Sequence, residues 1–275
     1  MQAPGLLQVE SIEMIEPTYM ALADARYTSE LLSMQGTEAK ILIDEEEDPV
    51  AVALHVSGVW KVASFLLRSP TIEVIEMLEE MDVEILQVEG EEWAGAVREH
   101  FAMRIARIPP GLDDFNPDRK EMIKSLMQEK LGDTKDLTCL DCGCGSGLGT
   151  VAARELGMLP LSFDNDAAML SQGLHAGRLI PEGTVLVDGT AASKYLEPAD
   201  VGLMLMAGSI NDFNSFIWKQ VTEQMLTLSG KFLCTTETEG EAKRIQGWCV
   251  AAERKAEVSE NTRDPFYDRW VVTVL

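Results

Sequence analysis

Residues 137–153 read LTCLDCGCGSGLGTVAA, and the rest of the fold can be worked out from this stretch. An apolar run leads into an acid at position 141, and glycines then occupy positions 143, 145 and 147. Glycine suits a backbone that takes positive φ or that a ligand must touch closely. A helix N-terminus beside such a turn offers unpaired N–H donors. The stretch therefore predicts a strand, a tight turn of bare backbone and the start of a helix.

The spacing of these glycines excludes two common nucleotide-binding loops. The dinucleotide fingerprint Gly-x-Gly-x-x-Gly/Ala fails in both registers, because Leu148 and Thr150 stand at its third glycine position. The phosphate-binding loop needs a lysine after its last glycine, and no lysine lies between Asp136 and Lys194. A nicotinamide-dependent oxidoreductase is therefore only the third hypothesis for this chain.

The pattern Asp-x-Gly-x-Gly-x-Gly does match, and it resembles the first motif of the class I S-adenosylmethionine (SAM)-dependent methyltransferases. The resemblance implies that SAM is the cofactor and that the methionine part of SAM lies on the turn. Its residues are Gly143, Gly145 and Gly147. The resemblance also implies that Asp141 helps to hold the amino end of that part, directly or through water.

Two further acids follow the next strands at the spacing that this resemblance implies. Asp164 directly follows the segment 159–163. The resembled family uses a carboxylate at this position to accept hydrogen bonds from both ribose hydroxyls of SAM. Asn165 comes next, where the family packs the adenine ring against the chain. Asp188 and Gly189 directly follow the segment 184–187. In the resembled family, an acid and the adjoining backbone at this position contact the edge of the adenine ring. Asp-Gly is also a common turn pair, so a purely structural role for these two residues remains open.

Strands and helices alternate from residue 137 to the C-terminus, which predicts an α/β fold with a doubly wound, mostly parallel sheet. No helix pattern separates the last two strands, so we expect a C-terminal antiparallel hairpin, as in the methyltransferase sheet. The seven strand segments are 137–141, 159–163, 184–187, 201–206, 231–236, 254–259 and 269–275. The helices between them are expected at 148–156, 166–178, 213–228 and 240–250.

The preceding residues predict a smaller α+β domain at 1–108, with the SAM-binding domain at 109–275. The breaker Ile108-Pro109-Pro110-Gly111 sets the boundary. In the first domain we expect strands at 39–44, 50–56 and 83–88, a helix that Ser69 and Pro70 open, and a second helix at 93–105. The second domain should begin with a helix from Asn116-Pro117 to Leu131. The first domain carries no motif, so its role is an expectation from position: a lid, a substrate-recognition unit or a dimerisation unit in a homodimer.

Residues after the fourth strand should face the methyl acceptor. Asn211 and Asp212 are the catalytic candidates there, either to orient the acceptor or to take its proton, and either could instead cap the helix expected at 213. Asp113 and Tyr267 are further candidate bases. The acceptor motifs for base, glutamine or arginine methylation are absent, so the acceptor is expected to be a small molecule or a protein side chain.

Charge and cysteine content restrict the function further. The chain has 23 basic and 46 acidic residues, a net charge of −23, which repels nucleic acid. Residues 1–115 hold 23 of these acids and 7 of the bases. The cysteines at 139, 142 and 144 lack a second Cys or His pair, so no metal site is predicted. Five cysteines, no export signal and no membrane span lead us to expect a reduced, cytoplasmic protein.

The sequence therefore predicts a SAM-dependent methyltransferase. The alternative is a non-enzymatic module that binds SAM or another adenosine compound and regulates a partner through residues 1–108.

Overall fold

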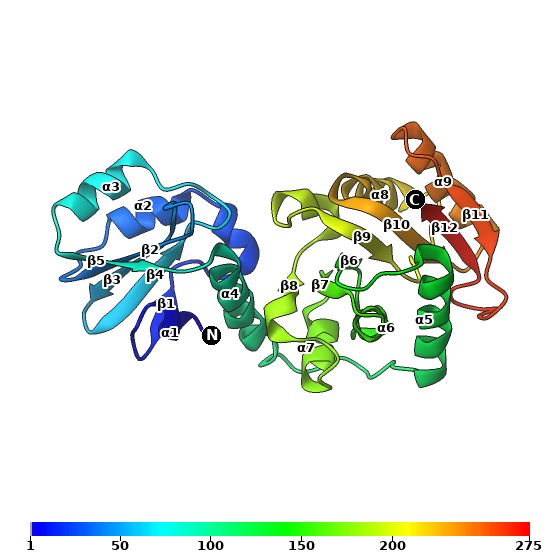
Figure 1. The fold of residues 1–275 in the computed structure, drawn as a ribbon, viewed down its shortest axis with the longest axis horizontal. Coiled ribbons are helices and arrows are strands. Elements are labelled where there is room, and N and C mark those ends of the chain that lie inside the picture. Colours follow the sequence, from blue (N-terminus) through cyan, green and yellow to red (C-terminus); the bar gives the residue numbers. More distant parts are fainter. Residues whose placement is uncertain (1) are drawn as a thin grey trace. The chain divides into compact units, whose positions relative to one another are not determined.

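The computed structural model describes residues 2–275 and divides into two compact units, one that ends at Met103 and one that spans Arg104–Leu275 (Figure 1). The division falls inside helix α4 (Gly90–Ile105), and the Pro109-Pro110 segment belongs to the second unit. Throughout residues 2–275, every helix is too short or too polar to cross a membrane.

The first unit is built on a five-stranded sheet with the order β1-β4-β3-β2-β5. The β2–β3 and β3–β4 pairs are antiparallel, whereas β1 pairs with β4 and β5 pairs with β2 in parallel. Besides α4, its elements are α1 (Ala3–Leu6), β1 (Ile12–Met14), the 3-10 helix η1 (Tyr19–Ala23), α2 (Arg26–Leu32), β2 (Ala39–Ile43), β3 (Pro49–Val56), β4 (Val59–Ser64), α3 (Ile72–Glu79) and β5 (Val83–Gln87).

Helices α2 and α3 cover one face of this sheet. Leu31 of α2 and Val74 of α3 pack in one buried cluster with Val52 and Leu54, which alternate along β3. The acidic turn 44–48 between β2 and β3 has a structural role, because the Glu45 carboxylate accepts a hydrogen bond of 2.7 Å from the Gly90 amide at the start of α4.

Several details of the first unit differ from the sequence predictions, and its helical elements α1, η1 and α2 were not predicted. Strands β1 and β4 were not predicted, because a three-residue strand and a short strand after a Ser-Gly turn carry little local pattern. The predicted helix opening at Ser69-Pro70 was wrong: α3 begins at Ile72, with Thr71 at its N-cap.

The second unit holds a seven-stranded sheet with the order β11-β12-β10-β9-β6-β7-β8. Only β12 runs antiparallel to its neighbours, so the predicted mostly parallel sheet with a C-terminal antiparallel hairpin is confirmed. The strands are β6 (Thr138–Cys142), β7 (Leu159–Asp164), β8 (Thr184–Leu186), β9 (Ala199–Met204), β10 (Ser229–Thr236), β11 (Glu257–Glu260) and β12 (Trp270–Val274).

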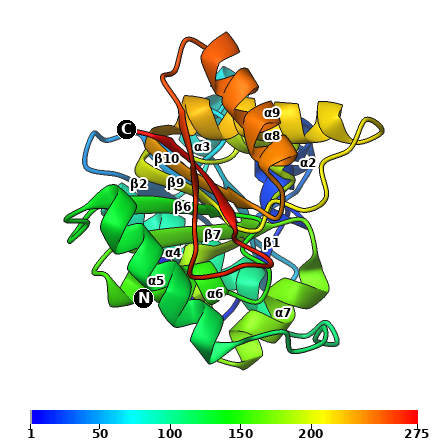
Figure 2. The same ribbon diagram turned by 90° about the vertical axis from the view of Figure 1, so that its right-hand side faces the viewer.

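Helices cover both faces of this sheet (Figure 2). On one face, Ile123 of α5 and Ala152 of α6 share a buried cluster with Cys139, Leu203 and Leu233, which point to the same side of adjacent strands. Helices α8 and α9 lie on the opposite face. The helical elements are α5 (Pro117–Leu131), α6 (Leu148–Glu155), α7 (Ala167–His175), η2 (Pro181–Gly183), η3 (Gly189–Lys194), α8 (Ser215–Leu228) and α9 (Glu239–Ala251).

This topology puts the ends of β6, β7, β8 and β9 along one edge of the sheet, since all four strands are parallel. In doubly wound sheets, ligands bind at that carboxyl edge. The loop before β12 reaches the same edge, because Trp270 pairs with Thr236 at the end of β10.

Candidate functional site at the carboxyl edge

The turn between β6 and α6 places a stretch of bare backbone at the carboxyl edge. Gly143, Gly145 and Gly147 all have positive φ, at 66°, 53° and 91°. The Gly143 amide donates a 2.9 Å hydrogen bond to the carbonyl of Phe163, which fixes the turn against β7. A Cβ on Gly143 would meet no atom within 4 Å, so this turn needs glycine for its dihedral angles and leaves open space beside its backbone.

Asp141 lies beneath this turn and is 1% exposed. The Thr150 hydroxyl of α6 donates a 2.7 Å hydrogen bond to its carboxylate, so the Ser162 hydroxyl, 2.8 Å from Thr150 Oγ1, donates in turn to Thr150. Burial raises the pKa of Asp141 from 3.8 to about 7, and the nearby charge of Asp164 adds to this effect. The carboxyl therefore titrates near neutral pH.

Gly149, in the first turn of α6, explains how the helix comes so close to this acid. A Cβ there would lie 3.1 Å from one Asp141 carboxylate oxygen and 2.7 Å from Leu205 Cδ1. Glycine at this position therefore lets the start of α6 pack against the carboxylate without displacing the Leu205 side chain.

Asp164, at the end of β7, connects its strand to the glycine turn. One carboxylate oxygen accepts a 2.9 Å hydrogen bond from the Gly145 amide, and the other accepts a 2.8 Å bond from the Asp166 amide. The residue is partly exposed, and a carboxylate offers about four lone-pair positions, so roughly two stay available to a ligand. Asn165 beside it is exposed.

Asp188 follows β8 and caps the short helix η3. One of its carboxylate oxygens accepts hydrogen bonds from the Thr190 amide at 2.9 Å and the Thr190 hydroxyl at 2.8 Å. Gly189 is packed closely, because a Cβ there would lie 3.2 Å from Val221 and 3.4 Å from Cys142 Sγ. Asp188 therefore has the structural role that the sequence analysis considered as an alternative. The cap uses one carboxylate oxygen and leaves the other oxygen of Asp188 unused.

The segment before α5 is fastened to the glycine turn. Ser146 Oγ donates a 2.7 Å hydrogen bond to Asp114, and Arg178 Nε donates to the Ser146 carbonyl at 2.8 Å. Arg178 also forms a 2.8 Å ion pair with Asp113 and lies 4.8 Å from the centre of the Phe115 ring. The hydrogen bond from Arg178 lowers the pKa of Asp113. Residues 113–115 are therefore attached to the edge at which the glycine turn lies.

Sequence analysis missed Ser146, Thr150, Ser162 and Arg178. Ser146 stands inside the motif, and its position alone could have marked it. The other three give no local signal, because their partners lie between 9 and 65 positions away in the chain.

The two catalytic candidates after β9 have structural partners in the second unit. The Asn211 side chain accepts a 2.9 Å hydrogen bond from the Phe213 amide. The Asp212 side chain is 85% exposed and forms a 2.7 Å ion pair with Arg244 of α9. Neither caps a helix at 213, because α8 begins at Ser215 with Asn214 at its N-cap, so that alternative was wrong. Within residues 2–275, no hydrogen bond or ion pair links either residue to the glycine turn.

A buried carboxylate organises the part of the edge beside the loop after β9. Asp268, 0% exposed, accepts hydrogen bonds from Arg119 Nε at 2.7 Å and from the Thr235 hydroxyl. Thr235 Oγ1 in turn accepts a 2.7 Å bond from the Met206 amide, and Met206 has the strained φ of 51°. The other candidate base, Tyr267, has its ring centre 5.5 Å from Arg119. Asp268 thus holds the loop after β9, strand β10 and α5 together.

The cysteines are all buried and carry free thiols. Burial raises the pKa of Cys139 and Cys144 well above 9 and also raises that of Cys142. Among residues 2–275, the one group of acids, histidines or cysteines close enough for a shared metal ion is Asp44, Glu45 and Glu46 on the turn between β2 and β3.

Comparison with known proteins gives structural likeness alone. The chain matches no protein-family model and no curated protein. A solved putative RNA methyltransferase from Pyrococcus horikoshii is 12% identical, with a TM-score of 0.46 over 64% of this chain and 96% of that one. Magnesium protoporphyrin IX methyltransferase from Synechocystis PCC 6803, with bound SAM, is 13% identical, with a TM-score of 0.46 over 66% and 96%. The N-methyltransferase NodS from Bradyrhizobium japonicum WM9 is 15% identical, with a TM-score of 0.44 over 59% and 97%. At these identities the likeness concerns the fold.

Proposed function

We propose that this chain binds SAM at the carboxyl edge of its seven-stranded sheet and transfers the methyl group to a small molecule or a protein side chain. The observation that carries this proposal is the joining of the glycine turn to Asp164. The turn supplies open backbone at Gly143, and the carboxylate hydrogen-bonded to Gly145 keeps lone pairs for a second partner.

The donors and acceptors at this edge support SAM as the ligand. Open space beside Gly143 suits the methionine part, because a ligand can lie against backbone that carries no side chain. Asp164 is assigned to the ribose hydroxyls, and Asn165, Asp188 and Gly189 to the adenine. Asp141 is almost fully enclosed, so we assign its effect on the amino end to charge beneath the turn and to bridging water.

Methyl transfer makes limited demands on the protein. SAM supplies a methyl group on a positively charged sulfur, so the protein must align the acceptor and exclude competing water. We assign alignment to the loop after β9, which Asp268 and Thr235 hold in place. An acceptor of low acidity also needs a base, and we assign that role to Asp212 and orientation of the acceptor to Asn211. Asp212 would first have to leave Arg244.

The alternative, a SAM-binding module without catalysis, has one observation in its favour. Both residues proposed for the acceptor are engaged elsewhere, Asn211 in its own turn and Asp212 with Arg244. Such a module would act on a partner through the first unit.

Calorimetric titration with SAM and with S-adenosylhomocysteine tests cofactor binding, with NAD as the comparison ligand. We expect both sulfur compounds to bind in the micromolar range or tighter and NAD not to bind. Absence of binding by both sulfur compounds would reject the proposal.

A transfer experiment separates the two functions. The protein and methyl-labelled SAM are incubated with a cell extract, once with its small molecules and once after their removal. Label in a protein or in a small-molecule fraction supports the transferase and rejects the module. Tight binding without transfer to any fraction would favour the module.

A further inference from the structure

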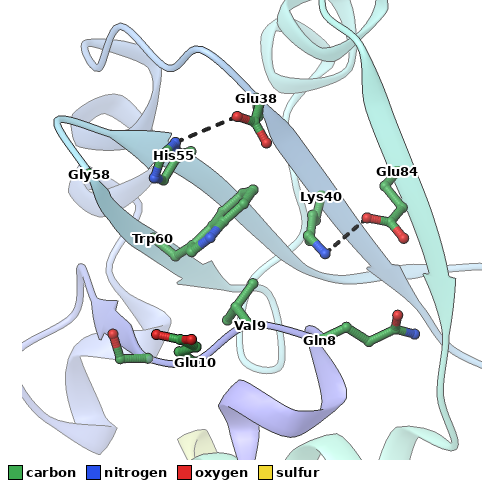
Figure 3. A pocket seen from close by; sticks show the side chains of 10 residues that line it. Gln8, Val9, Glu10, Glu38, Lys40, His55, Gly58, Trp60 and Glu84 are labelled. Carbon is green, nitrogen blue, oxygen red and sulfur yellow. Dashed lines mark ion pairs between the residues drawn. The ribbon is translucent and has the colours of Figure 1, made fainter.

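The first unit contains an open cavity of about 580 Å³ on the face of its sheet opposite α2 and α3 (Figure 3). Its wall includes the connection between α1 and β1, the start of β2 and β4, and the end of β3. Ligand pockets for small molecules are commonly about 300–1,000 Å³. A neighbouring hollow of about 190 Å³ shares Glu38, Lys40, Trp60 and Glu84 with it. The cavity lies in a different unit from the glycine turn.

The register of the strands assembles the cavity. Lys40 of β2 pairs with Glu84 of β5, and His55 of β3 pairs with Trp60 of β4. All four residues therefore lie on one face of adjacent strands. Figure 3 shows the Trp60 indole between His55 and Lys40, which gives the cavity an aromatic wall. The ring centres of His55 and Trp60 are 5.0 Å apart.

Among the described residues that line the cavity, Lys40 carries the one ammonium group, and this group is already neutralised. The Lys40 side chain is 11% exposed, and its Nζ lies 2.9 Å from Glu84 Oε2 and 5.5 Å from the centre of the Trp60 ring. This pairing neutralises the charge of Glu84, and the ammonium group also occupies one side of the Trp60 indole. It does not balance the remaining acids.

Those remaining acids leave the cavity with unbalanced negative charge. Glu38 has one candidate partner, His55 Nδ1 at 3.8 Å, which is an ion pair only when the imidazole is protonated. Glu10 makes no ion pair in the part of the chain that the structure describes. Asp82 lines the adjoining hollow. An anion would be repelled here, whereas a cation would gain both carboxylates and the indole.

We propose that this cavity binds a small organic cation, with ammonium groups carried on an aliphatic chain. Glu38 and Glu10 receive the ammonium groups, and the Trp60 indole packs against the methylene groups between them. A metal ion would use the carboxylates but gain nothing from the indole, so the aromatic wall favours an organic cation. The ligand can be a free amine or a lysine side chain of a polypeptide, since both present the same group.

Calorimetric titration of the 275-residue chain with spermidine in 150 mM NaCl tests this proposal. We expect saturation at one spermidine per chain. Glu38→Gln should weaken binding about threefold, the effect of losing one charged contact at a carboxylate that is 66% exposed. Trp60→Leu should weaken it about fivefold, whereas Trp60→Phe keeps an aromatic face and should retain most of the affinity.

Glu46→Gln is the matched control, because it removes an exposed acid of the same unit outside the cavity. It should change the affinity less than twofold. Thermal unfolding of every variant checks that each is folded, and the affinity for SAM should be the same in all of them. Failure of SAM binding in the wild-type chain would therefore leave this test intact.

A capped lysine tripeptide is titrated in parallel. Saturable binding of either ligand that depends on Glu38 supports the proposal, and the tighter of the two identifies the source of the cation. Equal affinities in the wild type, Glu38→Gln and Trp60→Leu would overturn it. So would complete displacement of both ligands by MgCl₂ at matched ionic strength, because that behaviour belongs to diffuse charge attraction.

Discussion

The carboxylate of Asp164 accepts a hydrogen bond of 2.9 Å from the backbone amide of Gly145. The end of β7 is thereby joined to the middle of the glycine turn, although the two residues are 19 positions apart. A ligand that bonds to Asp164 is held against the turn at the same time. The contact therefore fixes the orientation of the Asp164 carboxylate in the absence of a ligand, which is the property that a preorganised site needs.

Asp164→Ala should weaken SAM binding roughly tenfold to a hundredfold. Each hydrogen bond to a charged group contributes about 1.5–3 kcal/mol, and loss of the carboxylate also frees the Gly145 amide. Calorimetry with SAM gives the affinity. Asp166→Ala is the control, since Asp166 caps α7 next to the site. It should lower the free energy of unfolding by about 1 kcal/mol and leave SAM affinity within about twofold. Equal losses of affinity in both variants would contradict the assignment of Asp164.

Gly143→Ala should reduce SAM binding by much more than it reduces stability. The left-handed φ of 66° costs an L-residue about 1–2 kcal/mol, and the new methyl group would occupy the open space beside the turn. Gly177→Ala is the control, because Gly177 has a φ of 67°, a Cβ there would likewise meet no atom within 4 Å, and the residue is exposed after the end of α7. Chemical unfolding should show similar losses for both variants. If Gly177→Ala impaired SAM binding equally, the open space at Gly143 would have no ligand role.

Asp141→Asn should change how stability depends on pH. Burial raises the pKa of Asp141 from 3.8 to about 7, so the folded state holds its proton over a range in which the unfolded chain releases it. This contribution is complete below about pH 4 and is lost as pH rises through 7. Asparagine has no such proton. Relative to the wild type, Asp141→Asn should therefore gain stability from pH 4 to 8, by at most about 4 kcal/mol.

Urea unfolding of wild type and Asp141→Asn at pH 5, 6, 7 and 8 measures this difference. The shared surface charge cancels in the comparison, so the slope reports Asp141 alone. A difference in unfolding free energy that stays constant over this range would show that Asp141 does not titrate near pH 7.

Asp268→Ala should lower the free energy of unfolding by about 3–5 kcal/mol. Asp268 is 0% exposed and Arg119 is 17% exposed, so the substitution leaves a largely buried guanidinium and the Thr235 hydroxyl without their acceptor. Glu260→Ala is the control, because it removes an exposed ion pair with Arg269. That loss should be below about 1 kcal/mol. Similar Tm values for the two variants would mean that Asp268 does not hold α5 and strand β10 together.

Much of the second unit could be predicted from sequence because its signals are local. The apolar run before Asp141, the alternating glycines and the 3.6-residue periodicity of α5 depend on neighbours within a few positions. The first unit was harder. Strand β1 has three residues and pairs with β4 some 48 positions further on, so its register depends on a contact that no local pattern carries. The start of α3 also differs from the prediction, since Thr71 rather than Ser69 occupies the N-cap position.

The carboxyl edge shows the same division. Sequence named Asp141, Asp164 and Asp188, because an acid after a strand is visible in one dimension. It did not reveal that Asp188 caps η3 through Thr190, or that Asp113 pairs with Arg178 across 65 positions. Asp212 looked well placed after its strand, but the packing of α9 beside α8 gives it Arg244 as a partner.

The sequence by itself determined the order of strands and major helices in the second unit, the bare turn at 143–147 and the three acids at strand ends, because backbone preference and apolar periodicity act over short distances. The tertiary structure alone decided which groups meet: the Asp164 carboxylate and the Gly145 amide, Asp268 and Arg119, and Lys40 and Glu84 beside Trp60. Such contacts form only when distant segments are packed together, since the burial and charge of each group depend on neighbours that the chain brings close by folding.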